Sequence, residues 1–238
     1  MTPASPHADM PWRRPASSRC PYHVGVRLSP ADIADAVEAG LRAKFAELDC
    51  EQAVYGLDSL DELALHPLIA KALETTGFGV HREQRYPGDR MRRRISEGER
   101  CDLVITADGR GLVKEGSRGT LFDDPNACAL EDAFWLEVKI VSQFTSEGPN
   151  ANYSSQLLST VRQDITKLAK DPGILQAGLL IILFVRDDAV AEHDLKIWQD
   201  RCLERGLPLG APSRRTIAFS DRHGNGCCAI AVYPVPHL

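Results

Sequence analysis

An acid and an amine stand two residues apart within an otherwise apolar stretch of the sequence. The stretch is Phe-Trp-Leu-Glu-Val-Lys-Ile-Val at residues 134–141, and its two charged residues are Glu137 and Lys139. Because side chains alternate along a β-strand, both would project from the same face. A carboxylate and an ammonium inside a sheet are costly unless they are paired or bind a metal. The stretch therefore indicates either a structural ion pair or part of a catalytic site.

A second apolar stretch, residues 101–107, carries an acid near its start, Asp102. An aspartate at the start of a strand is often only a turn residue. Asp102 together with Glu137 and Lys139, however, supplies two hard oxygen ligands and one cation, which a magnesium-dependent phosphodiesterase requires. The combined pattern is far more specific than either of its parts.

Periodicity, capping residues and turn residues predict the elements that position these side chains. Ser29 and Pro30 begin the first helix, and Pro67 either bends the second helix or marks a later start for it. The predicted elements are helices at 30–48, from 58–59 to 77, at 153–170 and at 190–205, strands at 80–86, 101–107, 134–141 and 177–185, and a hairpin of strands 216–220 and 227–233. This order predicts an α/β sandwich with a mixed central sheet.

With Asp102 as the motif aspartate and Glu137-Val138-Lys139 as the E-x-K element, the sequence resembles the PD-(D/E)xK phosphodiesterase superfamily over residues 59–186. The resemblance implies a restriction-endonuclease-like αβββαβ core, with an extra N-terminal helix, a C-terminal helix and a β-hairpin added to it. The predicted division of the chain is a flexible basic tail at 1–28, a helical addition at 29–57 and a nuclease-like domain at 58–238. The interval of 35 residues between the two motifs is long for the family and holds a surface insertion at 109–132.

The resemblance also implies a role for each motif residue. Asp102 and Glu137 would bind Mg²⁺ or Mn²⁺ together with the backbone carbonyl of Val138, and Lys139 would orient the attacking water and stabilise the developing charge. The candidates for additional site residues are Glu62, His66, Glu83 and Gln156. Each also has a structural interpretation: a first-turn acid, a buried imidazole, a strand-surface ion pair and a solvated helix face, respectively.

Charge is distributed unevenly along this acidic chain, whose net charge is -5. Residues 81–100 hold seven arginines against four acids, a local charge of +3, and join the first two predicted strands beside the proposed site. Arginine binds phosphate oxygens in a bidentate manner, so the segment is a candidate nucleic-acid interface. Its four candidate contacts are Arg90, Arg92, Arg93 and Arg94. The alternative is an ordinary solvated hairpin.

Several classes of protein are disfavoured by composition. The apolar run at residues 179–185 is far shorter than a transmembrane helix, which disfavours a membrane-spanning protein. The seven cysteines are odd in number and never adopt a C-x-x-C spacing, which disfavours a zinc site and an extracellular disulfide framework. The N-terminal residues lack the apolar core of a secretory signal, so we expect a cytoplasmic protein without membrane contact. No phosphate-loop motif occurs, which disfavours NTP hydrolysis.

The hypothesis that joins these observations is a Mg²⁺-dependent nuclease that cleaves DNA, as an endonuclease, in defence against foreign DNA. The resemblance to this family also leads us to expect a homodimer or a partner protein that supplies specificity. One alternative is an inactive nucleic-acid-binding or scaffold protein on the same fold. Another is a protein-interaction subunit in which Glu137 and Lys139 form only a structural pair.

Overall fold

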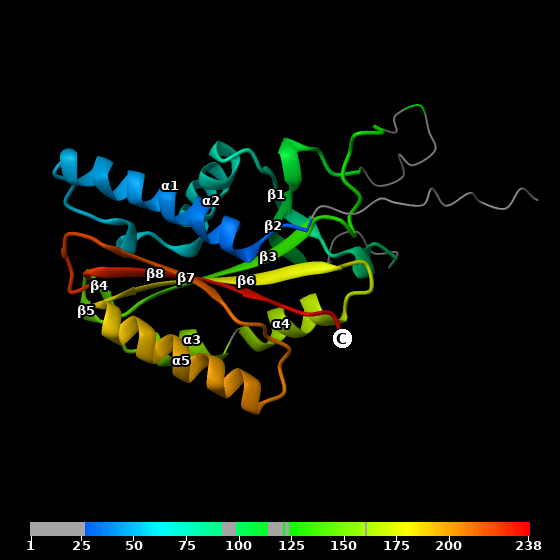
Figure 1. The fold of residues 1–238 in the computed structure, drawn as a ribbon. Helices are drawn as coiled ribbons and strands as arrows, with labels where there is room; N and C mark the ends of the chain where they lie inside the picture. Colours follow the sequence, from blue (N-terminus) through cyan, green and yellow to red (C-terminus); the bar gives the residue numbers. More distant parts are fainter. Residues whose placement is uncertain (1–26, 92–98, 114–120, 122–123, 160) are drawn as a thin grey trace, which may run out of the picture.

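A six-stranded sheet lies between two layers of helices (Figure 1). The structure is a computed structural model and describes residues 27–91, 99–113, 121, 124–159 and 161–238. Helices α1 and α2 cover one face of the sheet, and α3, α4 and α5 cover the other. The elements are α1 (Pro30–Cys50), η1 (Leu57–Ser59), α2 (Glu62–Thr75), β1 (Gly79–Arg85), η2 (Pro87–Met91), β2 (Arg100–Thr106), η3 (Ala107–Gly109), β3 (Phe134–Ser142), β4 (Phe144–Thr145), β5 (Gly148–Pro149), α3 (Tyr153–Ser159), α4 (Val161–Lys170), β6 (Gln176–Val185), α5 (Asp188–Glu204), β7 (Ser213–Ala218) and β8 (Cys227–Pro234).

The strand order of the sheet is β1-β2-β3-β6-β8-β7. Strands β3 and β6 are parallel, because the crossover through α3 and α4 returns the chain to the same end of the sheet. All other neighbours are antiparallel. The prediction of a mixed α/β sandwich is therefore confirmed.

The central strand β6 divides the apolar core into two halves. Leu179, Ile181 and Leu183 pack toward α4 and α5, whereas Leu180 and Ile182 pack toward α1 and α2. A strand covered on both faces needs apolar residues at every position, which explains its uninterrupted apolar sequence. Within the described ranges, no helix combines the length and the hydrophobicity that spanning a bilayer requires.

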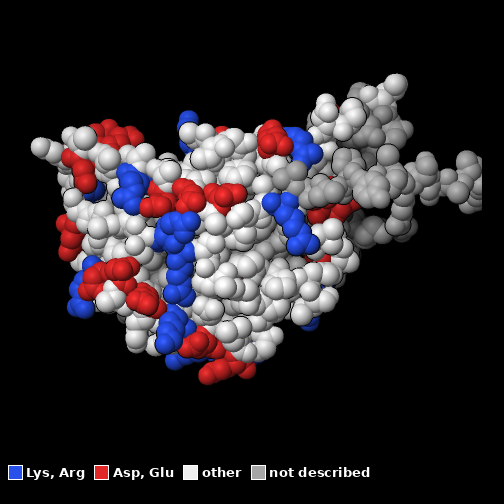
Figure 2. Space-filling view, in the orientation of Figure 1, with Lys and Arg blue, Asp and Glu red and all other residues white. Residues whose placement is uncertain are grey.

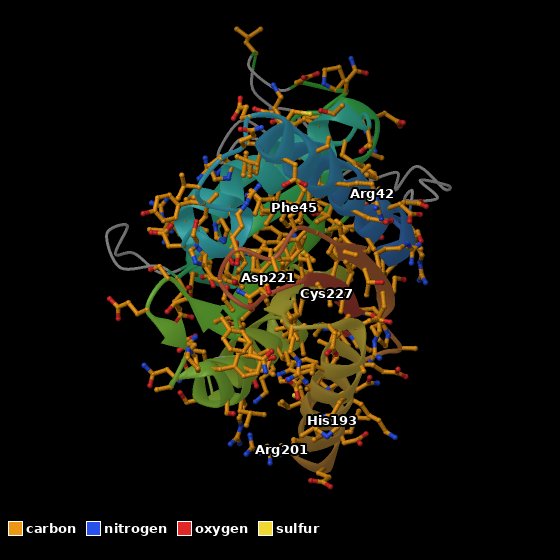
Figure 3. All side chains as sticks on the ribbon, turned by 90° about the vertical axis from the view of Figure 1, so that its left-hand side faces the viewer. Arg42, Phe45, His193, Arg201, Asp221 and Cys227 are labelled. Atoms are coloured by element: carbon orange, nitrogen blue, oxygen red, sulfur yellow. The ribbon has the colours of Figure 1, made fainter. Side chains whose placement is uncertain are left out.

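The first two helices follow their sequence signals closely. The Ser29 hydroxyl accepts a hydrogen bond from the Ala31 N–H and caps α1. Gly40 lets α1 approach α2, since a Cβ at this position would lie 2.2 Å from the Cβ of Ala72. Phe45 lies on the buried side of α1 (Figure 3). Its ring stacks on that of Phe219, with centroids 4.4 Å apart.

Two details differ from the sequence-based expectation. Helix α2 begins at Glu62 with Asp61 as its cap, so Pro67 lies inside the helix and the preceding turn is a short 3₁₀ helix. Leu60, which precedes the helix, and Leu63, in its first turn, are exposed to 38% and 71%. The helix predicted at 153–170 is divided into α3 and α4, and residue 160 lies outside the described residues.

Candidate active site

Strand β3 is paired on both sides at its start, and only on the β6 side further along. Pairing of β2 with β3 covers residues 134–136 of β3 and ends where Leu103 meets Leu136, whereas pairing with β6 continues to Ser142. Within the described residues, β3 is therefore paired on only one side from Glu137 onward. The E-x-K motif lies in this half-paired segment.

Carboxylates replace the missing strand at this open edge. The Val138 N–H donates to Asp102 Oδ2 at 2.8 Å, and the Ile140 N–H donates to Glu62 Oε2 at 3.4 Å. In a strand, the carbonyl of a residue points to the same edge as its N–H, so the Val138 carbonyl also faces this edge. The separation of β2 from β3 thus brings two acids and a backbone carbonyl to the middle of the sheet.

Glu137 is buried and contacts a residue that the sequence analysis missed, Tyr86. The Tyr86 hydroxyl donates to Glu137 Oε1, and the Tyr86 ring stacks on Trp135 with centroids 5.9 Å apart. The two hydrogen-bonded residues are 3% and 7% exposed. Tyr86 is neutral, follows β1 and lies 51 residues from its partner, so no local pattern in the sequence marks it.

Burial and a neighbouring acid change the pKa of Glu137. Burial, and next the negative charge of Asp102, raise the pKa of Glu137 from its ordinary value of 4.5 to about 9, while the Tyr86 hydrogen bond opposes the shift. Burial, and then the charges of Cys101 and Glu137, also raise the pKa of Tyr86, which therefore remains a hydrogen-bond donor. Two carboxylates in such an environment favour either a shared proton or a bound cation.

Three groups from three elements converge beside this pair. His66 of α2, Glu83 of β1 and Asp102 of β2 each offer a ligand atom, and these atoms lie within 4.8 Å of one another. His66 is 2% exposed, and its Nε2 has no hydrogen-bond partner among the described residues. Glu83 has a φ of 54°, a left-handed conformation that is uncommon for this residue type within a strand. Imidazole and carboxylate ligands at this separation suit a divalent cation.

Lys139 reaches Glu62 and not Glu137. Its Nζ lies 3.0 Å from Glu62 Oε2, and the two side chains are 19% and 36% exposed. The amine is therefore partly accessible to solvent and to a substrate. Glu62 accepts from both the Lys139 amine and the Ile140 N–H, so it fixes the position of the lysine relative to β3.

Helix α4 contributes a further acid that the sequence analysis did not single out, Asp164. Burial raises its pKa, with a contribution from Asp102, whereas Lys167 and Lys139 oppose the shift. Lys167 lies 3.1 Å from Glu99 and 3.5 Å from Asp164, and these interactions raise its pKa although burial alone would lower it. The spacing of Asp164 and Lys167 by three residues on a helix is the sequence signal for this pair.

Gln156 lies near Lys139, whereas the structure places few of the predicted arginines. Gln156 of α3 lies in a cleft with Glu62 and Lys139, where its Oε1 accepts from Asn150 Nδ2 at 3.1 Å. The backbone of Arg90 belongs to η2, and residues 92–94 lie outside the described residues. On the face shown in Figure 2, basic and acidic side chains are interspersed.

Comparisons of the chain with family models, with curated proteins and with solved structures found no match. The functional assignment therefore rests on the residues and on their geometry. The geometry places His66, Glu83 and Asp102 together, Glu137 beside Asp102, and Lys139 beside Glu62.

Proposed function

We propose that the chain is a divalent-metal-dependent phosphodiesterase of the restriction-endonuclease-like class that cleaves DNA. The observation that carries the proposal is the convergence of His66, Glu83 and Asp102, whose ligand atoms lie within 4.8 Å of one another, beside the E-x-K strand. His66 is buried and its Nε2 has no partner among the described residues, which is unfavourable unless a ligand binds it; Asp102 is partly buried and Glu83 is exposed, so both carboxylates are accessible to a cation. A divalent cation can activate water for phosphodiester hydrolysis, and a partly accessible lysine on the neighbouring strand can stabilise the developing charge.

The order of the elements supports the same class. The succession α2, β1, β2, β3, α3 with α4, and β6 is consistent with the αβββαβ core that the resemblance implies. Helix α1, helix α5 and the pair β7–β8 are additions, and β8 extends the sheet beyond β6. A fold alone does not determine activity, so the site residues carry the argument and the order of elements is secondary.

The ligand set allows two overlapping positions for a cation. In the first, Asp102, Glu137 and the Val138 carbonyl would hold the cation through oxygen alone, which suits Mg²⁺. In the second, Asp102, Glu83 and His66 would hold it, and the imidazole favours Mn²⁺ over Mg²⁺. When bound, the cation would polarise the phosphoryl oxygen and activate water. Lys139 would orient the water and stabilise the negative charge that develops on the phosphate.

An inactive DNA-binding protein on the same fold is the second candidate. The ion pair between Lys139 and Glu62 favours it, because an amine held by a carboxylate can serve a structural purpose. The two candidates differ in metal-dependent cleavage. A role in defence, a homodimer and a partner protein that supplies specificity remain predictions.

The test is incubation of the purified chain with supercoiled, linear and single-stranded DNA, with Mg²⁺, with Mn²⁺ and with EDTA. We expect cleavage with a metal ion and none with EDTA. Asp102→Asn should abolish cleavage and weaken Mn²⁺ binding in calorimetry, because one anionic ligand becomes neutral. The matched control is Asp108→Asn, an exposed acid at the other end of β2. Absence of cleavage on all substrates, with Mn²⁺ affinity unchanged by Asp102→Asn, would refute the proposal.

A further inference from the structure

A cleft of about 520 Å³ opens directly beside Lys139 and Glu62. One wall is formed by η1 and the start of α2, and the other by the end of β3, the β4–β5 turn and α3. A cleft of this volume holds a small molecule or one nucleotide, but not a duplex.

The lining of the cleft combines apolar side chains with neutral polar groups. Leu60 and Ile140 supply apolar surface, and the Leu60 side chain is 38% exposed and so accessible to a ligand. Ser142, Asn150 and Gln156 supply hydroxyl and amide groups. This composition suits a nucleobase, whose faces are apolar and whose edges form hydrogen bonds.

The charge of the cleft also favours a base over a phosphate. Asp61 and Glu62 line it, and Lys139 is the one cation among the described residues that do. Carboxylates repel a phosphate but accept hydrogen bonds from the amino groups of bases. Phosphate binding is therefore restricted to the end of the cleft at which Lys139 lies.

A buried asparagine links the two walls. Asn225, in the loop between β7 and β8, is 0% exposed and donates from Nδ2 to Asp58 Oδ2 at 2.9 Å and to the Phe144 carbonyl at 3.0 Å. The Phe144 N–H donates to Asn225 Oδ1 at 3.1 Å, and the Ser142 hydroxyl donates to the Asp58 carbonyl at 3.2 Å. These bonds connect η1 to β3 and β4, so the cleft is formed before a ligand arrives.

We propose that this cleft binds one unpaired nucleobase of the substrate strand, next to the phosphodiester that Lys139 contacts. A base inside the cleft cannot remain paired, so the preferred substrate is single-stranded DNA or an unpaired DNA end. The position of the reacting phosphate rests on the proposed function, whereas base binding can be measured without cleavage.

The test measures binding of an oligodeoxynucleotide that contains 2-aminopurine, in EDTA, by fluorescence. We expect the wild-type chain to bind the single strand about tenfold more tightly than the same sequence in a duplex. Leu60→Ser should weaken single-strand binding about fivefold, because an apolar contact with the base is lost. Leu60→Phe should strengthen it, since an aromatic face stacks on a base. The matched control is Leu63→Ser, which changes a more exposed leucine outside the cleft.

Equal affinity for single strand and duplex, with Leu60→Ser indistinguishable from Leu63→Ser, would overturn the base-binding proposal. Metal-dependent cleavage that persists alongside this result would leave the proposed function standing. Conversely, binding that depends on Leu60 without cleavage under any metal condition would uphold the cleft and refute the nuclease. The experiment therefore distinguishes failure of the base-binding proposal from failure of the proposed nuclease activity.

Discussion

The two halves of β3 differ in their pairing and in what they contribute. Residues 134–136 pair with strands on both sides and are at most 3% exposed, so they serve packing. Residues 137–142 pair with β6 alone within the described structure, and their free edge meets Asp102 and Glu62. One strand can thus contribute both to the core and to a reactive site. The two halves differ in that β2 pairs with the first half and not with the second.

Because β2 ends its pairing at Leu136, the N–H groups further along β3 need other acceptors, and this explains the positions of Asp102 and Glu62. A buried N–H without an acceptor is unfavourable by about 1–3 kcal/mol, so an unpaired strand edge must find other partners. Asp102 and Glu62 supply these acceptors to Val138 and Ile140, and each retains a second carboxylate oxygen for other contacts. The carboxylates therefore satisfy the backbone and remain available to a cation or to Lys139.

The sharpest test of the comparison is Leu136→Ala in the fully paired half. Leu136 is 0% exposed, and its truncation leaves a cavity in the core beneath α1 and α2. We expect the free energy of unfolding to fall by about 2–5 kcal/mol, measured by urea denaturation. Under conditions in which the variant is folded, the rate of cleavage per folded molecule should be unchanged. A loss of rate as large as that of a site variant would contradict the division into halves.

The converse test is Lys139→Ala in the half-paired segment. We expect cleavage to slow by about 10² or more, because the contribution of this amine arises in the transition state. Stability should change little, since an ion pair of this exposure contributes roughly 0–1 kcal/mol. Lys44→Ala is the control, because it removes the exposed pair between Lys44 and Glu47 on α1. Undiminished cleavage, or a large loss of stability, would favour a structural pair over a catalytic lysine.

The raised pKa of Glu137 predicts opposite effects of pH with and without metal. Between about 4.5 and about 9 the folded chain binds more protons than the unfolded chain, so stability without metal should fall as pH rises, by up to about 1.4 kcal/mol per pH unit. A cation competes with this proton. Thermal unfolding should therefore show a larger stabilisation by Mn²⁺ at about pH 8.5 than at about pH 6. Glu137→Gln should flatten both dependences, and a wild-type profile in this variant would assign the proton elsewhere.

The smallest expected effect concerns the basic segment that precedes β2. Replacing Arg92, Arg93 and Arg94 together with Ala should weaken DNA binding about equally for unrelated sequences. The slope of log K against log salt should flatten by up to about 0.9 per lost duplex contact. Cleavage at saturating DNA should persist, because these residues would position the substrate without acting on it. An unchanged slope in salt titrations would mean that phosphates are bound elsewhere on the chain.

Much of the fold follows from local patterns in the sequence. The serine cap and Pro30 locate α1, the apolar run at residues 179–185 locates β6, and alternation with turn residues locates β1 and β2. The start of α2 was predicted too early, because Leu60 fits a helical period while Asp61 makes the better cap. Local hydrogen bonding at the cap thus outweighed apolar periodicity.

Some features of the candidate site follow from local sequence patterns, and others follow from tertiary contacts. Local patterns suffice to place Glu137, Lys139 and Asp102 on strands of a buried sheet, since period-two alternation and apolar neighbours are properties of short segments. The contacts of Tyr86 with Glu137, of Glu62 with Lys139 across 77 residues, and of His66 and Glu83 with Asp102 arise only in the folded chain. The physical reason is that these contacts depend on where β2 separates from β3 and how α2 crosses the open edge. Register and helix position arise from packing of the whole core, which no short segment of sequence specifies.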